Sequence, residues 1–206
     1  MNEIKIYILN KETLAGMEEQ IVKVIAPHYL EKYQKAKAAS VKSDELGAGL
    51  LLSKILGVTR DEELKFGEYK KPMMKDDSKC FSLSHSVDYV VLAVSDFPVG
   101  IDIERTDRLS LSVLKRVLPS SCYEKLPQNE EDTNTKLEWT KSWTTVEAIL
   151  KADGSGFMVD PRDNEDFMEG WYHESILHDK CYMISCASKE PFILHVHNVT
   201  MHDFSI

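Results

Sequence analysis

The chain has 206 residues, of which 43% are hydrophobic and 29% charged, and its formal net charge at pH 7 is −9. This negative charge argues against a nucleic acid or an anionic lipid surface as partner, because phosphate groups require a basic face. No apolar run approaches the ~18 residues needed to cross a bilayer, and the first residues lack the pattern of a secretory signal. We therefore expect a cytoplasmic globular protein with no nucleic-acid or membrane partner.

The apolar spacing in the N-terminal half changes from period two to a helical period and back. Pro27 is expected to end the first helix and Gly57 the second, which begins at a cap at Ser43 or Asp44. The polar residues 84–88 are expected to form a turn between neighbouring strands. In chain order, the predicted elements are a strand at 4–8, helices at 17–26 and 44–57, a strand and loop at 66–72, and strands at 80–83 and 90–94.

The C-terminal half repeats this order of elements. It predicts a strand at 101–104, helices at 109–117, 122–126 and 136–151, and strands at 171–177, 181–187 and 193–199. Since strand, helices and strands occur twice, we infer an α+β fold of two similar halves, 1–103 and 104–206. No repeat is visible residue by residue, so this inference depends on the order of elements alone.

Two acidic residues, Asp102 and Glu104, alternate with Ile101 and Ile103 in the predicted strand. Residues two apart on a strand point to the same face, so both carboxylates can project together. Two such charges repel each other unless a cation joins them, and an all-oxygen pair suits a hard ion such as Mg²⁺. A solvated edge strand with two surface acids would show the same pattern, and both interpretations stay open.

Glu147 and Lys151 lie four positions apart on the longest predicted helix, which places them on one face about 6 Å apart along its axis. Such a pair most commonly stabilises its own helix. It can also supply a further metal ligand together with a lysine that binds phosphate or handles a proton. Trp143 and Trp139 precede Glu147 by one and two turns, so this side of the helix is not a plain solvated face.

His85 lies between Ser84 and Ser86 at the end of a predicted strand, where an imidazole can donate to a phosphate oxygen. No Gly-x-Ser-x-Gly elbow surrounds these serines, which argues against a serine nucleophile.

Two weaker patterns remain. His195 and His197 share a strand face, but the sequence offers no third metal ligand for them. The glycines of Gly154-Ser155-Gly156 end a helix instead of beginning one, which favours a helix cap over a phosphate loop.

Three segments taken together resemble the Sfp-type 4′-phosphopantetheinyl transferases. That family carries F-x-(L/I)-S-H-S, (V/I)-G-I-D-(I/V)-E and W-x-x-K-E-(A/S)-x-x-K in this order. The corresponding segments here are FSLSHS at 81–86, VGIDIE at 99–104 and WTTVEAILK at 143–151, at fitting distances. YKKP at 69–72 is similar to the family's G-K-P segment. The resemblance covers roughly residues 1–160.

The resemblance implies two similar subdomains related by a pseudo-twofold axis, the 4′-phosphopantetheinyl transferase fold, in a monomer with coenzyme A in the cleft between them. It also implies an activity. Such an enzyme transfers the 4′-phosphopantetheine group of coenzyme A to a serine of an apo acyl or peptidyl carrier protein and releases 3′,5′-ADP.

Site roles follow from the same resemblance. Asp102, Glu104 and Glu147 would bind Mg²⁺, or Mn²⁺ in its place. Ser84 and His85 would contact coenzyme A phosphates. Lys71, and less certainly Lys32, would meet the 3′-phosphate. Lys151 would lie at the pyrophosphate and would be catalytic together with Glu147, the expected acceptor of the serine proton.

The chain departs from the family pattern at Val146, where lysine is usual, which predicts one positive charge fewer near the phosphates. Two alternatives therefore stay open. One is a homologue that binds coenzyme A or a carrier with weak or no transfer. The other is a magnesium-dependent phosphohydrolase that uses the same acids.

Overall fold

The computed structural model describes residues 2–154, 156, 160–164 and 166–204. Its helices and strands are, in chain order, β1 (Glu3–Asn10), α1 (Glu18–Ile21), α2 (Pro27–Lys35), α3 (Ala39–Leu56), β2 (Leu64–Phe66), β3 (Pro72–Met74), β4 (Cys80–Ser86), β5 (Tyr89–Ser95), β6 (Gly100–Arg105), α4 (Leu111–Val117), α5 (Ser120–Tyr123), α6 (Thr133–Asp153), β7 (Tyr172–His178), β8 (Tyr182–Ser188) and β9 (Ile193–Val199).

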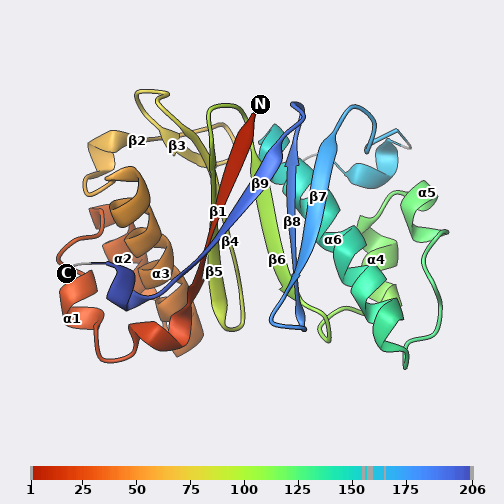
Figure 1. Cartoon of the computed structure of the whole chain (residues 1–206), viewed down its shortest axis with the longest axis horizontal. Helices are drawn as coiled ribbons and strands as arrows, with labels where there is room; N and C mark the ends of the chain where they lie inside the picture. The colour runs from red at the N-terminus through yellow and green to blue at the C-terminus, as the bar shows by residue number, and fades with distance from the viewer. Residues whose placement is uncertain (1, 155, 157–159, 165, 205–206) are drawn as a thin grey trace.

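The two sheets lie next to each other between two layers of helices (Figure 1). Helices α1–α3 cover the outer face of a sheet with the strand order β4-β5-β1-β9, and α4–α6 cover the outer face of a second sheet with the order β6-β8-β7. The inner faces of the two sheets pack against each other through a shared core. The predicted α+β class is confirmed.

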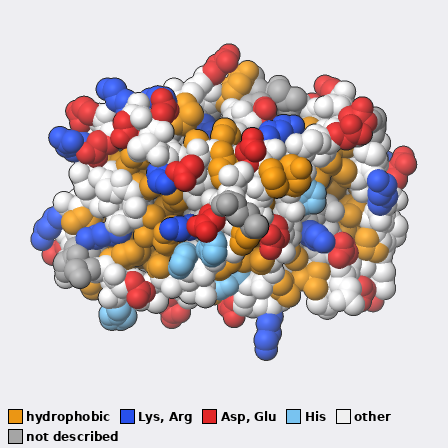
Figure 2. Space-filling model, turned by 45° about the horizontal axis from the view of Figure 1, so that its top comes forward, with side chains coloured by type: hydrophobic (Ala, Val, Ile, Leu, Met, Phe, Trp, Pro, Cys, Tyr) orange, Lys and Arg blue, Asp and Glu red, His pale blue; other side chains and the backbone are white. Residues whose placement is uncertain are grey.

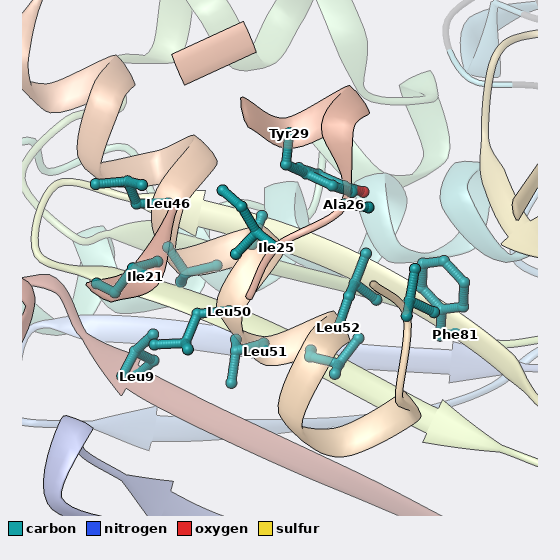
Figure 3. Close-up of a cluster of buried hydrophobic side chains, with 14 of the residues drawn as sticks. Leu9, Ile21, Ile25, Ala26, Tyr29, Leu46, Leu50, Leu51, Leu52 and Phe81 are labelled. Carbon is teal, nitrogen blue, oxygen red and sulfur yellow. The ribbon is translucent and has the colours of Figure 1, made fainter. Parts of the chain in front are cut away.

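The first unit is built on α3 and the sheet beneath it. Three consecutive leucines, Leu50–Leu52, are fully buried with Leu9 of β1 and Phe81 of β4 (Figure 3). Gly57 ends α3 in the left-handed conformation, as predicted. Burial of so many large aliphatic side chains fixes α3 on the sheet. It thereby also fixes the position of β4, which carries Ser84 and His85.

The second unit is built on α6, which lies close against β6. A Cβ at Gly100 would lie 1.9 Å from the carbonyl oxygen of Ala148 and 2.4 Å from the amide nitrogen of Ala152. Only glycine permits this approach of strand to helix. Gly154 ends α6 in the left-handed conformation, which confirms the predicted cap; Ser155 lies outside the described residues.

Two tyrosine–aspartate hydrogen bonds cross between the units. Tyr89, the first residue of β5, donates to Asp179 of the β7–β8 turn at 3.0 Å. Tyr182, the first residue of β8, donates to Asp88 of the β4–β5 turn. The two rings meet edge to face with centroids 4.9 Å apart. Each unit thus provides one donor and one acceptor, and we call this pair of bonds the tyrosine clasp.

Some element boundaries differ from the predictions. Pro27 begins α2 instead of ending a helix, because proline fits the first helical turn, where its missing N–H has no partner to lose. β4 continues through Ser86, so residues 84–86 are strand and only Val87 and Asp88 form the turn. Residue 103 lies inside β6, and β9 pairs with β1 of the first sheet. Within the described residues, no helix is both long and apolar enough to cross a membrane.

Candidate functional site

The acidic residues of β6 project away from the core between the sheets. Ile101 and Ile103 are buried in that core, so the alternation of the strand turns Asp102 and Glu104 to its other face, toward α6. The strand geometry places the two carboxylates on one face of β6, as predicted. The site therefore begins as two acids on the edge strand of the second sheet, beside the first unit.

Lys151 of α6 neutralises Asp102. Its ammonium nitrogen lies 2.6 Å from Oδ1 of Asp102 and 2.9 Å from Oγ of Ser84. Ser84 in turn donates to the same Asp102 oxygen at 2.7 Å. Strand β4, strand β6 and helix α6 each provide one member of this triangle, so it joins both units. The structure thus brings together three residues that the sequence assigned to the site.

Glu104 accepts several hydrogen bonds at a single oxygen. The hydroxyl of Ser86 donates to Oε1 at 2.6 Å and the backbone N–H of Arg105 donates to the same atom at 2.8 Å. Arg108 also lies 3.4 Å from Oε1. The carboxylate is therefore held by its own strand and by β4, outside the ion pair of Asp102 and Lys151.

Glu147 lies on α6 within the electrostatic reach of both β6 acids. Burial, together with repulsion by Asp102 and Glu104, raises the pKa of Glu147 to about 7, against the opposing effect of Lys151. Three acids therefore share this region with one lysine. A carboxyl group with such a pKa can exchange a proton near neutral pH, which suits a general base.

Glu147→Gln is expected to raise the free energy of unfolding of the metal-free protein at pH 8 by up to about 3 kcal/mol. The pKa of Glu147 is higher in the folded protein, about 7, than its ordinary value of 4.5. The stability associated with the protonated form is therefore complete below pH 4.5 and is lost as the pH rises through 7. Urea unfolding in chelator at pH 4 and pH 8 measures this, and the gain should vanish at pH 4. Glu138→Gln, at an exposed position of the same helix, should show no gain at either pH.

A cavity of about 230 Å³ opens beside this cluster, between the β2–β3 turn, β4 and the end of α6. Lys70, Lys71 and Lys151 belong to its lining together with the apolar residues Phe81 and Leu83. Lys71 donates to the carbonyl oxygens of Val99 and Lys151 at 3.2 and 2.5 Å. Burial lowers the pKa of Lys71. The cavity is thus partly apolar with cationic edges, as a nucleotide-bearing ligand requires.

Two predicted phosphate ligands lie apart from this cavity. His85 alternates with Ser84 on β4 and faces the opposite side of the strand, where its Nδ1 lies 3.4 Å from Asp44 and its side chain is 57% exposed. Asp44 also pairs with the buried ammonium of Lys11 at 2.6 Å. Lys32 lies on α2, 3.7 Å from Glu45. No sequence pattern indicates the pairing of Lys11 with Asp44, which only the fold creates.

The described residues form no ready-made metal site. Among them, no group of three or more His, Cys, Asp or Glu side chains is arranged so that it could hold a metal ion. His195 and His197 follow β9, where His195 lies 3.6 Å from Glu3 and His197 stacks on Tyr7.

Comparisons with known proteins show what the chain is similar to. Residues 98–186 match the model of the 4′-phosphopantetheinyl transferase superfamily. The 4′-phosphopantetheinyl transferase Sfp of Bacillus subtilis (strain 168) is 28% identical over 165 residues, which cover 76% of this chain and 73% of that protein. These matches support an Sfp-type 4′-phosphopantetheinyl transferase. Two further relatives match shorter stretches. The 4′-phosphopantetheinyl transferase gsp of Aneurinibacillus migulanus is 30% identical over 52% of this chain and 45% of its own length. The 4′-phosphopantetheinyl transferase psf-1 of Bacillus pumilus is 36% identical over 42% of this chain and 37% of its own length.

Val146, where the family usually has lysine, lies in the apolar core of the second unit. Its side chain is 1% exposed and packs with Leu114, Trp139 and Leu150 in the core between α4 and α6. Residue 146 is not among the residues that line the cavity. Position 146 is turned about 100° around the helix from Glu147, which takes it into the apolar interior.

Proposed function

We propose that this protein transfers the 4′-phosphopantetheine group of coenzyme A to a serine of an apo acyl or peptidyl carrier protein and releases 3′,5′-ADP. One observation carries the proposal. The ion pair of Lys151 with Asp102 lies at the edge of a cavity between the two units, within the electrostatic reach of Glu147. The similarity to this family supports the same activity.

The two units also support the proposal of a pseudo-twofold fold, with halves near 1–103 and 104–206. Each unit has a hairpin, β4–β5 or β7–β8, and a long helix ended by a left-handed glycine. The tyrosine clasp joins the equivalent ends of the two hairpins by reciprocal bonds. A cleft between halves related in this way would hold coenzyme A.

Donor chemistry supports a divalent cation at Asp102, Glu104 and Glu147. All three provide carboxylate oxygens, which Mg²⁺ prefers. Asp102 accepts a hydrogen bond from Ser84 at Oδ1, and Glu104 accepts one from Ser86 at Oε1. Burial, and after it repulsion by Asp102 and Glu104, raises the pKa of Glu147, and a bound cation would relieve that repulsion. When bound, Mg²⁺ or Mn²⁺ would neutralise charge on the pyrophosphate.

Coenzyme A would place its phosphates at the cationic edge of the cavity. Lys151 would turn from Asp102 toward the pyrophosphate, and Lys71 would exchange a carbonyl contact for the 3′-phosphate. Each charge-assisted contact contributes about 1.5–3 kcal/mol. Ser84 lies next to Lys151 and would bind the same phosphates, whereas His85 and Lys32 would reach the ligand only from the outer side of β4 and from α2.

Transfer requires one bond to form and one to break. The carrier serine Oγ attacks the β-phosphorus of coenzyme A, and the bond from that phosphorus to the bridging oxygen of the pyrophosphate breaks, so 3′,5′-ADP leaves. Glu147 accepts the serine proton, directly or through water, as the carboxylate of α6 beside the transferred group. Lys151 stabilises negative charge on the phosphate oxygens.

The carrier protein would dock without long-range attraction if it is acidic, because this chain carries a net charge of −9. On the face in Figure 2, acidic and basic side chains are interspersed. Short-range contacts would therefore decide which carrier is accepted. The monomeric state and the cytoplasmic location stay predictions from the sequence.

Intact-mass spectrometry of an apo carrier protein incubated with coenzyme A, Mg²⁺ and this protein tests the proposal. The carrier should gain the mass of one phosphopantetheine group, and the gain should disappear with chelator and with Glu147→Ala. Glu138→Ala, an exposed acid of the same helix, should leave the gain unchanged. Release of phosphate or nucleotide without a carrier would instead indicate the phosphohydrolase. Coenzyme A binding with no mass gain on acyl and peptidyl carriers would indicate the binding-only homologue.

A further inference from the structure

The strands β4 and β6 lie side by side at the junction of the two units but belong to different sheets. Three serines alternate along the β4 face that meets β6. Ser82, Ser84 and Ser86 are 4%, 7% and 2% exposed, respectively. Phe81, immediately before Ser82, turns instead into the core under α3. Hydroxyls therefore occupy the face that a sheet would normally fill with apolar side chains.

Each hydroxyl bonds to β6. Ser82 accepts from the backbone N–H of Ile101 at 3.2 Å. Ser84 donates to Asp102 and Ser86 donates to Glu104, at 2.7 and 2.6 Å. We call Ser82, Ser84 and Ser86 the serine ladder. The serine ladder joins two strands from different sheets, and two of its hydroxyls also orient the two acids of β6.

We propose that Ser86 is a positioning residue that fixes the carboxylate of Glu104 for a divalent cation. Ser84 already contacts Lys151 and belongs to the expected phosphate site, whereas Ser86 is bonded to Glu104. Glutamate has three rotatable side-chain bonds, and two donors on Oε1, the Ser86 hydroxyl and the Arg105 N–H, restrict them. Oε2 is thereby left as the oxygen for the cation. Hydrogen bonds to a metal-binding carboxylate commonly contribute 10–100-fold in metal affinity.

The ladder contains its own control. Ser82 is buried on the same face of the same strand and also makes one bond to β6, but its partner is a backbone N–H. Ser82→Ala therefore removes a hydrogen bond of the junction without releasing a carboxylate. A purely structural role for the ladder predicts equal effects of Ser82→Ala and Ser86→Ala on every property.

Mn²⁺ binding, followed by electron paramagnetic resonance of the free ion with and without coenzyme A, tests the proposal. Ser86→Ala should weaken Mn²⁺ binding about 10-fold. Ser82→Ala should change it less than about 2-fold, below the range of effects on a metal-binding carboxylate. In transfer assays, Ser86→Ala should raise the Mg²⁺ concentration for half-maximal rate by a similar factor and leave kcat at saturating Mg²⁺ near that of wild type.

The inference rests on the proposed function for its transfer assay only. If the wild type binds Mn²⁺ but modifies no carrier, the function fails, and a selective effect of Ser86→Ala on binding still supports the positioning role. The inference is overturned if both variants weaken Mn²⁺ binding equally, if neither does, or if the wild type binds no Mn²⁺ in either condition.

Discussion

Gly100→Ala is expected to destabilise the protein by at least about 3 kcal/mol and to abolish transfer. The added Cβ would meet the carbonyl oxygen of Ala148 at 1.9 Å and the amide nitrogen of Ala152 at 2.4 Å. Both are backbone atoms inside a helix, so no rotamer change relieves the overlap. α6 must move away from β6, and because Glu147 and Lys151 lie on α6, their distances to Asp102 increase in the same movement.

Urea unfolding and the carrier mass assay together measure this effect. Gly67→Ala is the matched control, because its Cβ would meet the terminal methyl of Met73 at 3.4 Å and lie at an ordinary contact distance of 3.8 Å from the carbonyl oxygen of Lys71. That methyl ends a flexible side chain and can shift. If Gly100→Ala unfolded at the same urea concentration as Gly67→Ala, the close packing of α6 on β6 would be wrong.

Val146→Lys, which restores the usual family residue, is expected to destabilise this protein by about 3 kcal/mol or more. The side chain would enter the apolar core formed with Leu114, Trp139 and Leu150. An ammonium group there must either remain charged without a partner or lose its proton, and both cost free energy. Coenzyme A binding should not become tighter, because the new charge lies away from the cavity.

Val146→Ala separates lost packing from buried charge. It should cost about 2 kcal/mol through the removed methyl groups and the space that they leave, which is less than the lysine variant costs. Urea unfolding measures both variants, and calorimetry measures coenzyme A binding. A stable Val146→Lys protein with tighter binding would contradict the buried position and restore the expectation drawn from the family pattern.

The acids of β6 could be paired from the sequence because a strand has a strict period of two, and the alternation of Ile101 and Ile103 shows which face is buried. Glu147 and Lys151 could be placed on one helix face for a similar reason. Both predictions needed local geometry alone. The contact of Lys151 with Asp102 joins residues 49 positions apart. Only the family resemblance put these two residues in one site.

The positions of Ser84 and His85 were missed for a local reason. Residues 84–88 are polar, and a polar run predicts a turn, so the strand was ended too early. In the structure, β4 continues to Ser86 because the other unit supplies hydrogen-bond partners for its serines. Val146 shows the same limit: its neighbour Leu114 comes from α4, which the sequence does not place against α6.

The tyrosine clasp has a consequence for the origin of the chain. Each unit contributes a tyrosine at the start of a strand and an aspartate in the preceding turn, so one surface matches a copy of itself. Self-matching contacts are what two identical subunits use around a twofold axis. Under the twofold relation that we propose, an ancestral single unit could have paired with itself through this contact. After gene duplication and fusion, the fused chain would have kept this interface. The two halves would then have been free to diverge into different ligand-binding roles.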